Sequence, residues 1–177
     1  MSKVRVAING FGRIGRTAFK ILHARSDVEV VAINDLTDTK TLAHLLKYDS
    51  NYPGHDWYES IEATDDGIAV DGKTVHVFGE KEPAKLPWGA HDIDVVIEST
   101  GFFVDPALAK AHVDEAGAKK VIISAPAKGE GAETIVLGVN DDKIAAVGDV
   151  VSNASCTTNC IAPVAAVIES AFGIEKA

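Results

Sequence analysis

Three glycines near the N-terminus constrain the fold of this chain more than any other feature. Gly10, Gly12 and Gly15 form a G-x-G-x-x-G motif after the β-branched run Val4–Ile8 and before a segment with helical periodicity. In a strand–turn–helix context, the first glycine allows a tight turn and the second lets a pyrophosphate approach the backbone. The third lets helix and strand pack closely. The motif therefore predicts a βαβ unit that binds a dinucleotide.

The start of the predicted helix is the candidate phosphate site. The N–H groups around Arg13 and Ile14 are expected to face the pyrophosphate, because the first N–H groups of a helix have no partner within it. Phe11 lies between the first two glycines and joins the same set of candidate cofactor residues.

An acidic residue after the second strand strengthens this prediction. The apolar run Val28–Ile33 is typical of a buried parallel strand, and it ends at Asn34 and Asp35. Asp35 follows Gly15 at the spacing of about 20 residues from which a carboxylate accepts hydrogen bonds from the adenine ribose. An acid here repels a 2′-phosphate, so NAD is favoured over NADP. The alternative is that Asp35 is an ordinary helix cap or turn residue.

The remaining pattern indicates an α/β fold of the Rossmann type, a doubly wound and mostly parallel sheet. Turn residues around Asp71-Gly72 predict a small antiparallel insertion in this sheet. Around His55 the chain resembles a loop, and His55 itself is expected at the surface. The expected helices are Thr39–Tyr48 and Pro106–Ala116; the expected strands are Gly67–Val70, Lys73–Phe78, Asp94–Glu98, Lys120–Ser124, Thr134–Leu137 and Val147–Val151.

Ligands of open α/β sheets bind at the carboxyl ends of the strands. Thr100 and Gly101 follow one predicted strand and Ser124 follows another, so all three are candidate cofactor contacts. The strand Val147–Val151 leads at the same edge to the cysteine segment. We therefore expect the dinucleotide pocket and that segment to share one edge of one sheet.

Ser155-Cys156-Thr157 precedes a predicted helix, Ile161–Phe172, with Pro163 in its first turns. Cys156 is expected at or next to the helix N-terminus, where free N–H groups and the dipole stabilise a thiolate. The neighbouring hydroxyl side chains suit an anionic or carbonyl substrate. The alternative is a buried, inert thiol, which is the common state of free cysteine.

Composition excludes several other classes of protein. The net charge of -9 and the scattered basic residues argue against nucleic-acid and membrane-surface partners. Cys156 and Cys160, four apart on a helix, are too far apart for a disulfide and are expected to be free thiols in a reducing compartment. The six His are dispersed, so no metal site is expected. With no signal peptide or spanning segment apparent, we expect a cytoplasmic protein.

Several segments, in order along the chain, resemble phosphorylating glyceraldehyde-3-phosphate dehydrogenase. The similarity runs from Lys3 to Ala177, and the cysteine motif is highly specific. An erythrose-4-phosphate dehydrogenase branch is close, but the segment Ser124–Lys128 fits the glyceraldehyde phosphate branch better. The matching segments are Ala7–Arg16, Leu45–Ser50, Glu98–Gly101, Ile123–Gly129 and Ala154–Cys160.

The resemblance implies a glycolytic enzyme that uses NAD, inorganic phosphate and glyceraldehyde 3-phosphate, and that is a homotetramer. It implies that Cys156 is the nucleophile, that Ser155 and Thr157 bind phosphate, and that Ser124 lies near the nicotinamide. Asp35, followed by Leu36, matches the NAD-using members. Lys81 stands where the family often has an arginine beside the adenine, and lysine is a weaker stacking partner.

The resemblance also implies two domains, an NAD-binding domain at 1–151 and the beginning of a catalytic domain at 152–177. None of the six His follows Cys156, so none matches the family's catalytic base. We therefore expect a half-enzyme that needs a complementing chain or the rest of the catalytic domain. The rival hypotheses are a non-catalytic NAD-binding or interaction module and a redox-sensing thiol protein.

Overall fold

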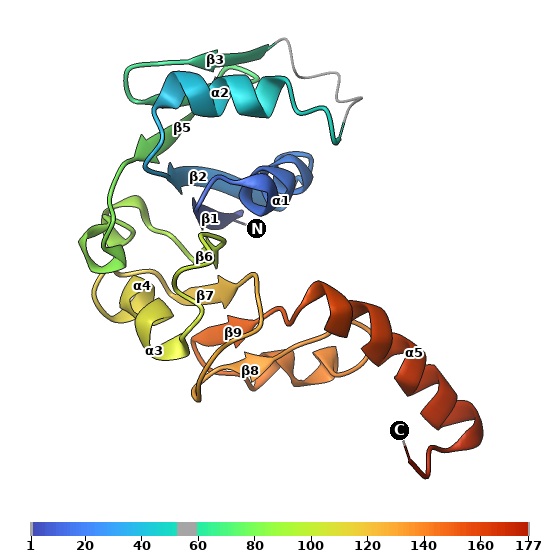
Figure 1. The fold of residues 1–177 in the computed structure, drawn as a ribbon. Helices are drawn as coiled ribbons and strands as arrows, with labels where there is room; N and C mark the ends of the chain where they lie inside the picture. The colour runs from blue at the N-terminus through green and yellow to red at the C-terminus, as the bar shows by residue number, and fades with distance from the viewer. Residues whose placement is uncertain (1, 53–59, 177) are drawn as a thin grey trace.

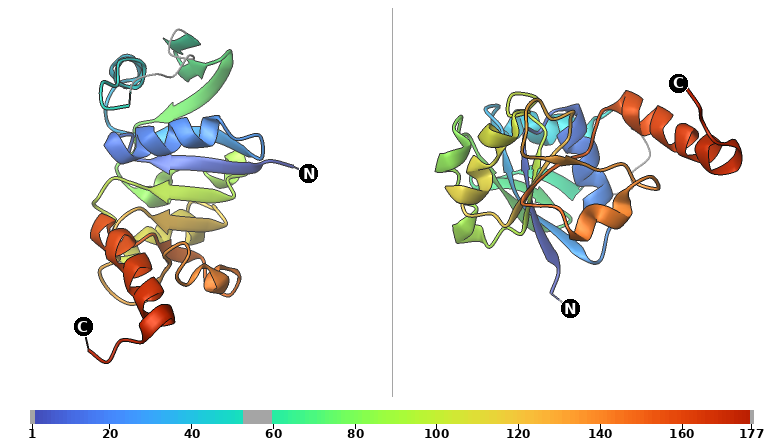
Figure 2. Two further views of the ribbon diagram at one scale, coloured as in Figure 1. Left: turned by 90° about the vertical axis from the view of Figure 1, so that its right-hand side faces the viewer. Right: turned by 90° about the horizontal axis from the view of Figure 1, so that it is seen from below.

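The computed structural model describes residues 2–52 and 60–176. In this part of the chain, strands form one sheet of nine in the order β3-β4-β5-β2-β1-β6-β7-β9-β8. Helices cover both of its faces: Figure 2 shows α1 on one face and α3 and α4 on the other. The predicted α/β class, mostly parallel with a small antiparallel part, is confirmed. The surface position expected of His55 lies outside the described residues.

The elements follow the predicted order along the chain (Figure 1). The strands are β1 (Val4–Asn9), β2 (Val28–Asn34), β3 (Ile61–Ala63), β4 (Gly67–Val70), β5 (Lys73–Phe78), β6 (Val95–Glu98), β7 (Lys120–Ile123), β8 (Glu133–Thr134) and β9 (Val150–Ser152). The helices are α1 (Arg13–His23), α2 (Thr39–Lys47), α3 (Pro106–Ala109), α4 (Ala111–Asp114) and α5 (Cys156–Phe172), with short 3-10 helices η2 (Pro83–Lys85), η3 (Gly89–His91) and η4 (Asp141–Ala145).

Parallel pairing places the carboxyl ends of the central strands at one edge of the sheet. β1 pairs in parallel with β2 on one side and with β6 on the other, and Asn9 aligns with both Asn34 and Glu98. β7 and β9 continue the parallel sheet. Each face has its own apolar core, one built around Phe19 of α1 and the other around Trp88 before η3. This arrangement places every predicted loop of the site at the same edge.

The antiparallel part is a hairpin between β4 and β5. Its turn residues Asp71 and Gly72 both have positive φ, 51° and 76°, which is the backbone of a type I′ turn. β5 also pairs in parallel with β2, so the hairpin extends the main sheet and is not a separate layer. The short strand β3, which the sequence pattern did not predict, pairs with β4.

Several predicted elements have other bounds in the structure; the strand expected over Val147–Val151, for example, is β9 (Val150–Ser152). The helix expected over Pro106–Ala116 is two four-residue helices, because the turn tightens where Val113 N–H donates to the Lys110 carbonyl, three residues back. The strand expected over Thr134–Leu137 ends at Thr134. There the Asn140 side chain accepts from Val136 N–H and donates to the Thr134 carbonyl, which turns the chain away.

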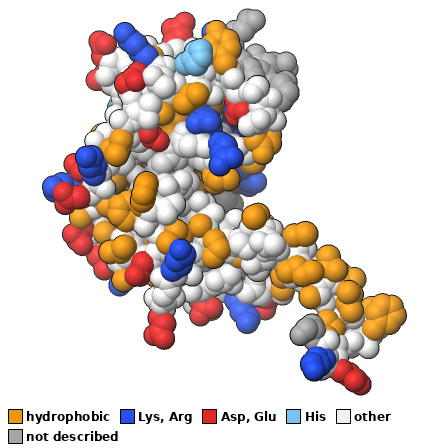
Figure 3. All heavy atoms as spheres, viewed as in Figure 1, with side chains coloured by type: hydrophobic (Ala, Val, Ile, Leu, Met, Phe, Trp, Pro, Cys, Tyr) orange, Lys and Arg blue, Asp and Glu red, His pale blue; other side chains and the backbone are white. Residues whose placement is uncertain are grey.

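Helix α5 begins five residues earlier than the helix expected from Ile161. Ser155 is its N-cap, since the Ser155 hydroxyl accepts a hydrogen bond from Thr158 N–H at 2.9 Å. Pro163 therefore lies inside the helix and not in its first turn. In Figures 1 and 3, α5 leads away from the sheet and carries a dense patch of apolar side chains. Of the described residues, no helix is both long and apolar enough to cross a bilayer.

Candidate cofactor and thiol site

The glycine loop has the geometry that the motif predicts. Gly10 has φ of +89°, and a Cβ atom there would lie 2.6 Å from the Thr100 backbone nitrogen. A Cβ atom at Gly15 would lie 2.1 Å from the Gly10 carbonyl oxygen. A Cβ atom at Gly12, in contrast, would meet nothing within 4 Å. The first and third glycines are thus required by packing, and the second leaves open space at the loop surface.

That open space lies at the N-terminus of α1. Gly12 is the N-cap and contributes no capping side chain, so the N–H groups at Arg13 and Ile14 are presented to the space beyond the loop. Arg16 Nη1 donates to the Phe11 carbonyl at 2.9 Å, and this bond stabilises the turn. A helix N-terminus with an uncapped glycine suits a pyrophosphate.

A cavity of about 500 Å³ opens beside this loop. Its walls come from the carboxyl ends of β1, β2 and β6 and from the segment after β5, as the strand order predicts. Among the described residues, its lining consists of Asn9, Gly10, Gly12, Asn34, Asp35, Leu36, Glu80, Lys81, Ser99, Thr100, Phe102 and Phe103.

Asp35 connects the glycine loop to the second strand. Its Oδ2 accepts from Phe11 N–H at 2.8 Å, and its Oδ1 accepts from Thr37 N–H at 2.9 Å. Asp35 N–H donates to the Phe78 carbonyl. These bonds fix the carboxylate in the cavity wall next to the loop. A carboxylate oxygen has room for further donors, so ribose hydroxyls can bind to it.

The far wall of the cavity carries both signs of charge. Glu80 and the exposed Lys81 follow β5. The Glu82 backbone N–H, which donates to Glu80 Oε1 at 3.0 Å, holds the pKa of Glu80 below its usual value. Leu36 and the exposed Phe102 supply apolar surface opposite. Apolar walls with few polar groups are typical of a cofactor pocket.

Three residues at the ends of β6 and β7 were predicted to contact a cofactor. Thr100 lines the cavity, and Gly101 follows it with φ of +79° and an open side. Ser124 lies outside the cavity walls formed by the described residues, half-buried at the end of β7, where its N–H donates to the Glu98 carbonyl. The structure therefore brings Thr100 to the cavity and leaves Ser124 further along the same edge.

The chain reaches Cys156 through a constrained turn. Ser152 is fully buried; its hydroxyl donates to the Ala125 carbonyl and accepts from Ala154 N–H. Ala154 has φ of +61°, an unusual conformation for a residue with a side chain, which costs about 1 kcal/mol. Asn159 braces the other side, donating to the Asn153 carbonyl at 2.8 Å.

Cys156 is the first residue of α5, and its thiol is exposed and free. The prediction that it lies at a helix N-terminus is confirmed, and the alternative of a buried thiol is wrong for the described chain. Ser155 and Thr157 flank it, with their hydroxyl oxygens 3.4 Å apart. Cys160 is also exposed and free, one turn further along the helix. Among residues 2–52 and 60–176 there is no cluster of His, Cys, Asp and Glu that could hold a metal ion.

Sequence reasoning missed a buried polar feature beneath the cavity. Asn9, Asn34 and Glu98 end three neighbouring strands, align in register and are 1%, 5% and 2% exposed. Their side chains are hydrogen-bonded in sequence, Asn34 to Asn9 at 2.7 Å and Asn9 to Glu98 at 2.5 Å. One sequence feature could have indicated these residues: each of the three apolar runs ends in a polar residue.

Residues 4–106 match the family model described as glyceraldehyde 3-phosphate dehydrogenase, NAD binding domain. Residues 155–177 match the model for the C-terminal domain of the same family.

Several curated relatives are similar over nearly the whole chain. The glyceraldehyde-3-phosphate dehydrogenase of Thermotoga maritima is 55% identical over 175 residues, covering 96% of this chain and 50% of the relative. Glyceraldehyde-3-phosphate dehydrogenase 1 of Bacillus subtilis is 55% identical, covering 98% and 51%. Glyceraldehyde-3-phosphate dehydrogenase 2 of Streptomyces avermitilis is 56% identical with the same coverage. The chain thus spans about half the length of these relatives.

Proposed function

This chain belongs to the glyceraldehyde 3-phosphate dehydrogenase family, and from that premise we propose that it supplies the cofactor site and the nucleophile of a phosphorylating, NAD-dependent aldehyde dehydrogenase. The proposed reaction is the glycolytic conversion of D-glyceraldehyde 3-phosphate and inorganic phosphate to 1,3-bisphosphoglycerate. The observation that carries the proposal is that Cys156 begins α5 at the same sheet edge as the cavity.

NAD fits the residues at the cavity. The adenosine would lie between Asp35 and Lys81, with the ribose hydroxyls donating to Asp35. The pyrophosphate would lie over Gly12, on the N–H groups of Arg13 and Ile14, with Gly10, Phe11 and Gly15 shaping the turn. The nicotinamide end would extend past Thr100 and Gly101 toward Ser124. When bound, NAD accepts the hydride that leaves the substrate carbon.

Cys156 would perform the covalent chemistry. Its thiolate adds to the aldehyde carbon to give a hemithioacetal, which becomes a thioester on loss of the hydride and a proton. Inorganic phosphate then attacks the thioester carbon, forming the acyl phosphate and releasing the thiolate. The N–H groups at the start of α5 stabilise the anionic sulfur, and the hydroxyls of Ser155 and Thr157 would bind phosphate oxygens.

We propose a domain boundary between residues 151 and 152, with 1–151 as the NAD-binding domain and 152–177 as the beginning of the catalytic domain. The match of residues 155–177 to the C-terminal family model supports it. We also propose that α5 is covered by the remainder of a catalytic domain, by other subunits of a homo-oligomer, or by both. The exposure of its apolar side chains supports this: Val167 is 68% exposed and Phe172 87%.

A second candidate is an NAD-binding module without turnover. All six His of the 177 residues precede Cys156, and His112 is fully buried beneath the cavity. General-base catalysis contributes about 10²–10⁴-fold to such reactions, so a thiol without a base would be slow. The cofactor site would be the same in both cases.

An activity assay separates the two candidates. NADH formation is followed with NAD, phosphate and glyceraldehyde 3-phosphate, using the chain alone and then with a polypeptide that supplies the remainder of a relative's catalytic domain. We expect little activity from the chain alone and a rate on complementation that Cys156→Ser abolishes and Cys160→Ser retains. A complemented rate that survives Cys156→Ser would refute the proposed nucleophile. Failure of a folded, complemented complex to form NADH would favour the non-catalytic module.

A further inference from the structure

A buried polar row consists of Asn34, Asn9, Glu98 and His112; its first two members line the cavity and the other two are not part of the lining. Its first three members end β2, β1 and β6 in one register, and His112 comes from α4 on the face below. His112 is 0% exposed and Glu98 is 2% exposed. Removing such groups from water is costly unless every donor and acceptor is paired, so their bonds must be accounted for individually.

Glu98 is the centre of this polar row. Its Oε1 accepts from Thr100 N–H at 2.8 Å and from the Thr100 hydroxyl at 2.5 Å. Its Oε2 accepts from Asn9 Nδ2 at 2.5 Å and lies 3.1 Å from His112 Nε2. Each carboxylate oxygen therefore has two partners, which matches the acceptor capacity of an ionised carboxylate.

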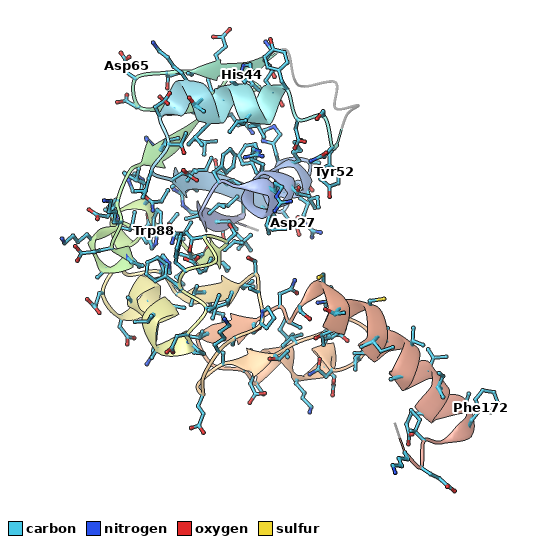
Figure 4. All side chains as sticks on the ribbon, viewed as in Figure 1. Asp27, His44, Tyr52, Asp65, Trp88 and Phe172 are labelled. Carbon is cyan, nitrogen blue, oxygen red and sulfur yellow. The ribbon has the colours of Figure 1, made fainter. Side chains whose placement is uncertain are left out.

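The indole of Trp88 fixes the tautomer of His112. Trp88 Nε1 lies 2.9 Å from His112 Nδ1, and an indole nitrogen can only donate. His112 Nδ1 must therefore accept, which leaves the ring proton on Nε2, where it is donated to Glu98. The 3.3 Å approach of Asn9 Nδ2 to the same Nε2 joins two donors and is not a hydrogen bond. Trp88, labelled in Figure 4, lies beside the α3–α4 segment.

The polar row is connected to the cavity wall on two sides, through Glu98 and through Asn34. On one side, the Thr100 hydroxyl accepts from Phe102 N–H at 3.1 Å, so Glu98 sets the backbone of the segment after β6. On the other, Asn34 donates to the Glu80 carbonyl and accepts from Glu80 N–H, both at 2.8 Å. The segment carrying Lys81 is therefore fixed through the same row. The residues that these hydrogen bonds reach, Thr100, Phe102 and Glu80, all line the cavity, as does Lys81.

We propose that Glu98, oriented by His112, is a positioning residue for the cofactor, acting through Thr100 and through Asn9. The proposal rests on the proposed binding of NAD in this cavity. Glu98 does not itself face the cavity; it holds the two loops whose spacing a dinucleotide must match. A buried carboxylate is suited to this because it accepts four bonds at once, and replacing it leaves several donors unpaired.

NAD affinity of the full chain, measured by calorimetry, is the first test. Glu98→Gln preserves shape but turns an NH₂ group toward donors, and we expect NAD to bind about tenfold more weakly. The matched control is Glu115→Gln, which removes the same charge from an exposed position beyond α4 and should leave the affinity unchanged. In a Thr100→Val background, Glu98→Gln should weaken NAD binding much less than it does in the wild-type chain, because the two residues act through one interaction.

A folded Glu98→Gln chain with wild-type NAD affinity would overturn the proposal, and so would full additivity with Thr100→Val. If Glu98→Gln does not fold, His112 variants decide. His112→Gln retains a donor for Glu98 and should bind NAD more tightly than His112→Phe; equal affinities of folded variants would contradict the role of His112.

The tautomer gives a readout that does not depend on NAD. In ¹⁵N spectra of the histidine-labelled chain, His112 should carry its proton on Nε2, and Trp88→Phe should release this preference. A proton on Nδ1 in the wild-type chain would contradict the hydrogen bond from His112 to Glu98 and so overturn the proposal. If the chain shows the expected tautomer but no NAD binding, the proposed function fails while the hydrogen-bonded row stands.

Discussion

Gly10 and Gly12 are two residues apart in one turn, yet a side chain at each would meet different surroundings. A Cβ atom on Gly10 would collide with the Thr100 backbone and would require a positive φ, whereas the space beside Gly12 is open. We expect Gly10→Ala to destabilise the chain by about 2 kcal/mol or more. Gly12→Ala should fold normally but bind NAD weakly, because its methyl group occupies the place of the pyrophosphate.

Urea unfolding of both variants, together with NAD titration, checks this pair. Equal stability losses would mean that the loop is distorted by either substitution, and normal NAD binding by Gly12→Ala would place the pyrophosphate elsewhere.

The two cysteines are both exposed but differ in their position on α5. Cys156 is the first residue of α5, where the leading N–H groups of a helix have no partner within it, while Cys160 lies one turn into the helix. We expect Cys156 to react faster with iodoacetamide, since the thiolate is the reacting species and a helix N-terminus stabilises it. Peptide mapping after brief treatment measures the ratio, and Cys160→Ser serves as a control. Preferential labelling of Cys160 would contradict the proposed nucleophile.

Part of the cavity lining could be predicted from sequence, from glycine and strand-end patterns and, for Lys81, from the family resemblance. Gly10, Gly12, Asp35, Lys81 and Thr100 all line the cavity. The polar row beneath it could not be predicted, since the pairing of Asn9, Asn34 and Glu98 depends on the register of three strands that are distant in the chain. Strand ends alone do not reveal which face a side chain occupies.

At the scale of elements, the helix α1 is held to the segment after α2 by a buried ion pair. Lys20 Nζ lies 2.7 Å from Asp49 Oδ2, and the two side chains are only 2% and 9% exposed. The hydrogen bond from Lys20 holds the pKa of Asp49 below its ordinary value of 3.8. A lowered carboxylate pKa stabilises the fold above the unfolded-state pKa, and this contribution is lost as pH falls through the folded-state value.

We expect Asp49→Asn to lower the free energy of unfolding by about 3 kcal/mol at pH 7, because it removes the carboxylate that lies against the buried ammonium group of Lys20. The difference from wild type should begin to shrink below about pH 4, the unfolded-state pKa of an aspartate, and should vanish as the pH falls through the lower pKa of Asp49 in the folded chain. Urea unfolding at several pH values measures both effects. Asp114→Asn is the matched control: its partner Lys110 is exposed, so the change should be under about 1 kcal/mol. A pH-independent difference would show that the ion pair is not responsible.

The boundaries of helices and strands were predicted well where apolar runs are long. They were missed where hydrogen bonds from side chains determine where an element begins or ends. Strands β1, β2 and β6 follow buried apolar runs and were identified closely. β8 ended early because of Asn140, and α5 began early because Ser155 caps it. The run from Ile161 was predicted to be helical, and α5 has no buried residue among those that the structure describes.

At the scale of the whole molecule, the described chain divides into a well-packed sheet and an exposed final helix. The sheet has an apolar core on each face, while Phe172, labelled in Figure 4, lies at the far end of α5, away from both. Among the described residues that line the cavity, none belongs to α5, so the proposed adenosine and pyrophosphate contacts are made by the sheet and its loops. NAD affinity is therefore a direct measure of the sheet and its loops, independent of turnover.

Calorimetric titration of the 177-residue chain with NAD and with NADP tests the central claim most directly. Asp35 lies in the cavity wall where the ribose hydroxyls are expected, and a 2′-phosphate there would place two negative charges close together. Such repulsion is about 4 kcal/mol at 4 Å near a protein surface, so NADP should bind at least about tenfold more weakly than NAD. Equal or tighter binding of NADP would contradict the placement of the dinucleotide against Asp35.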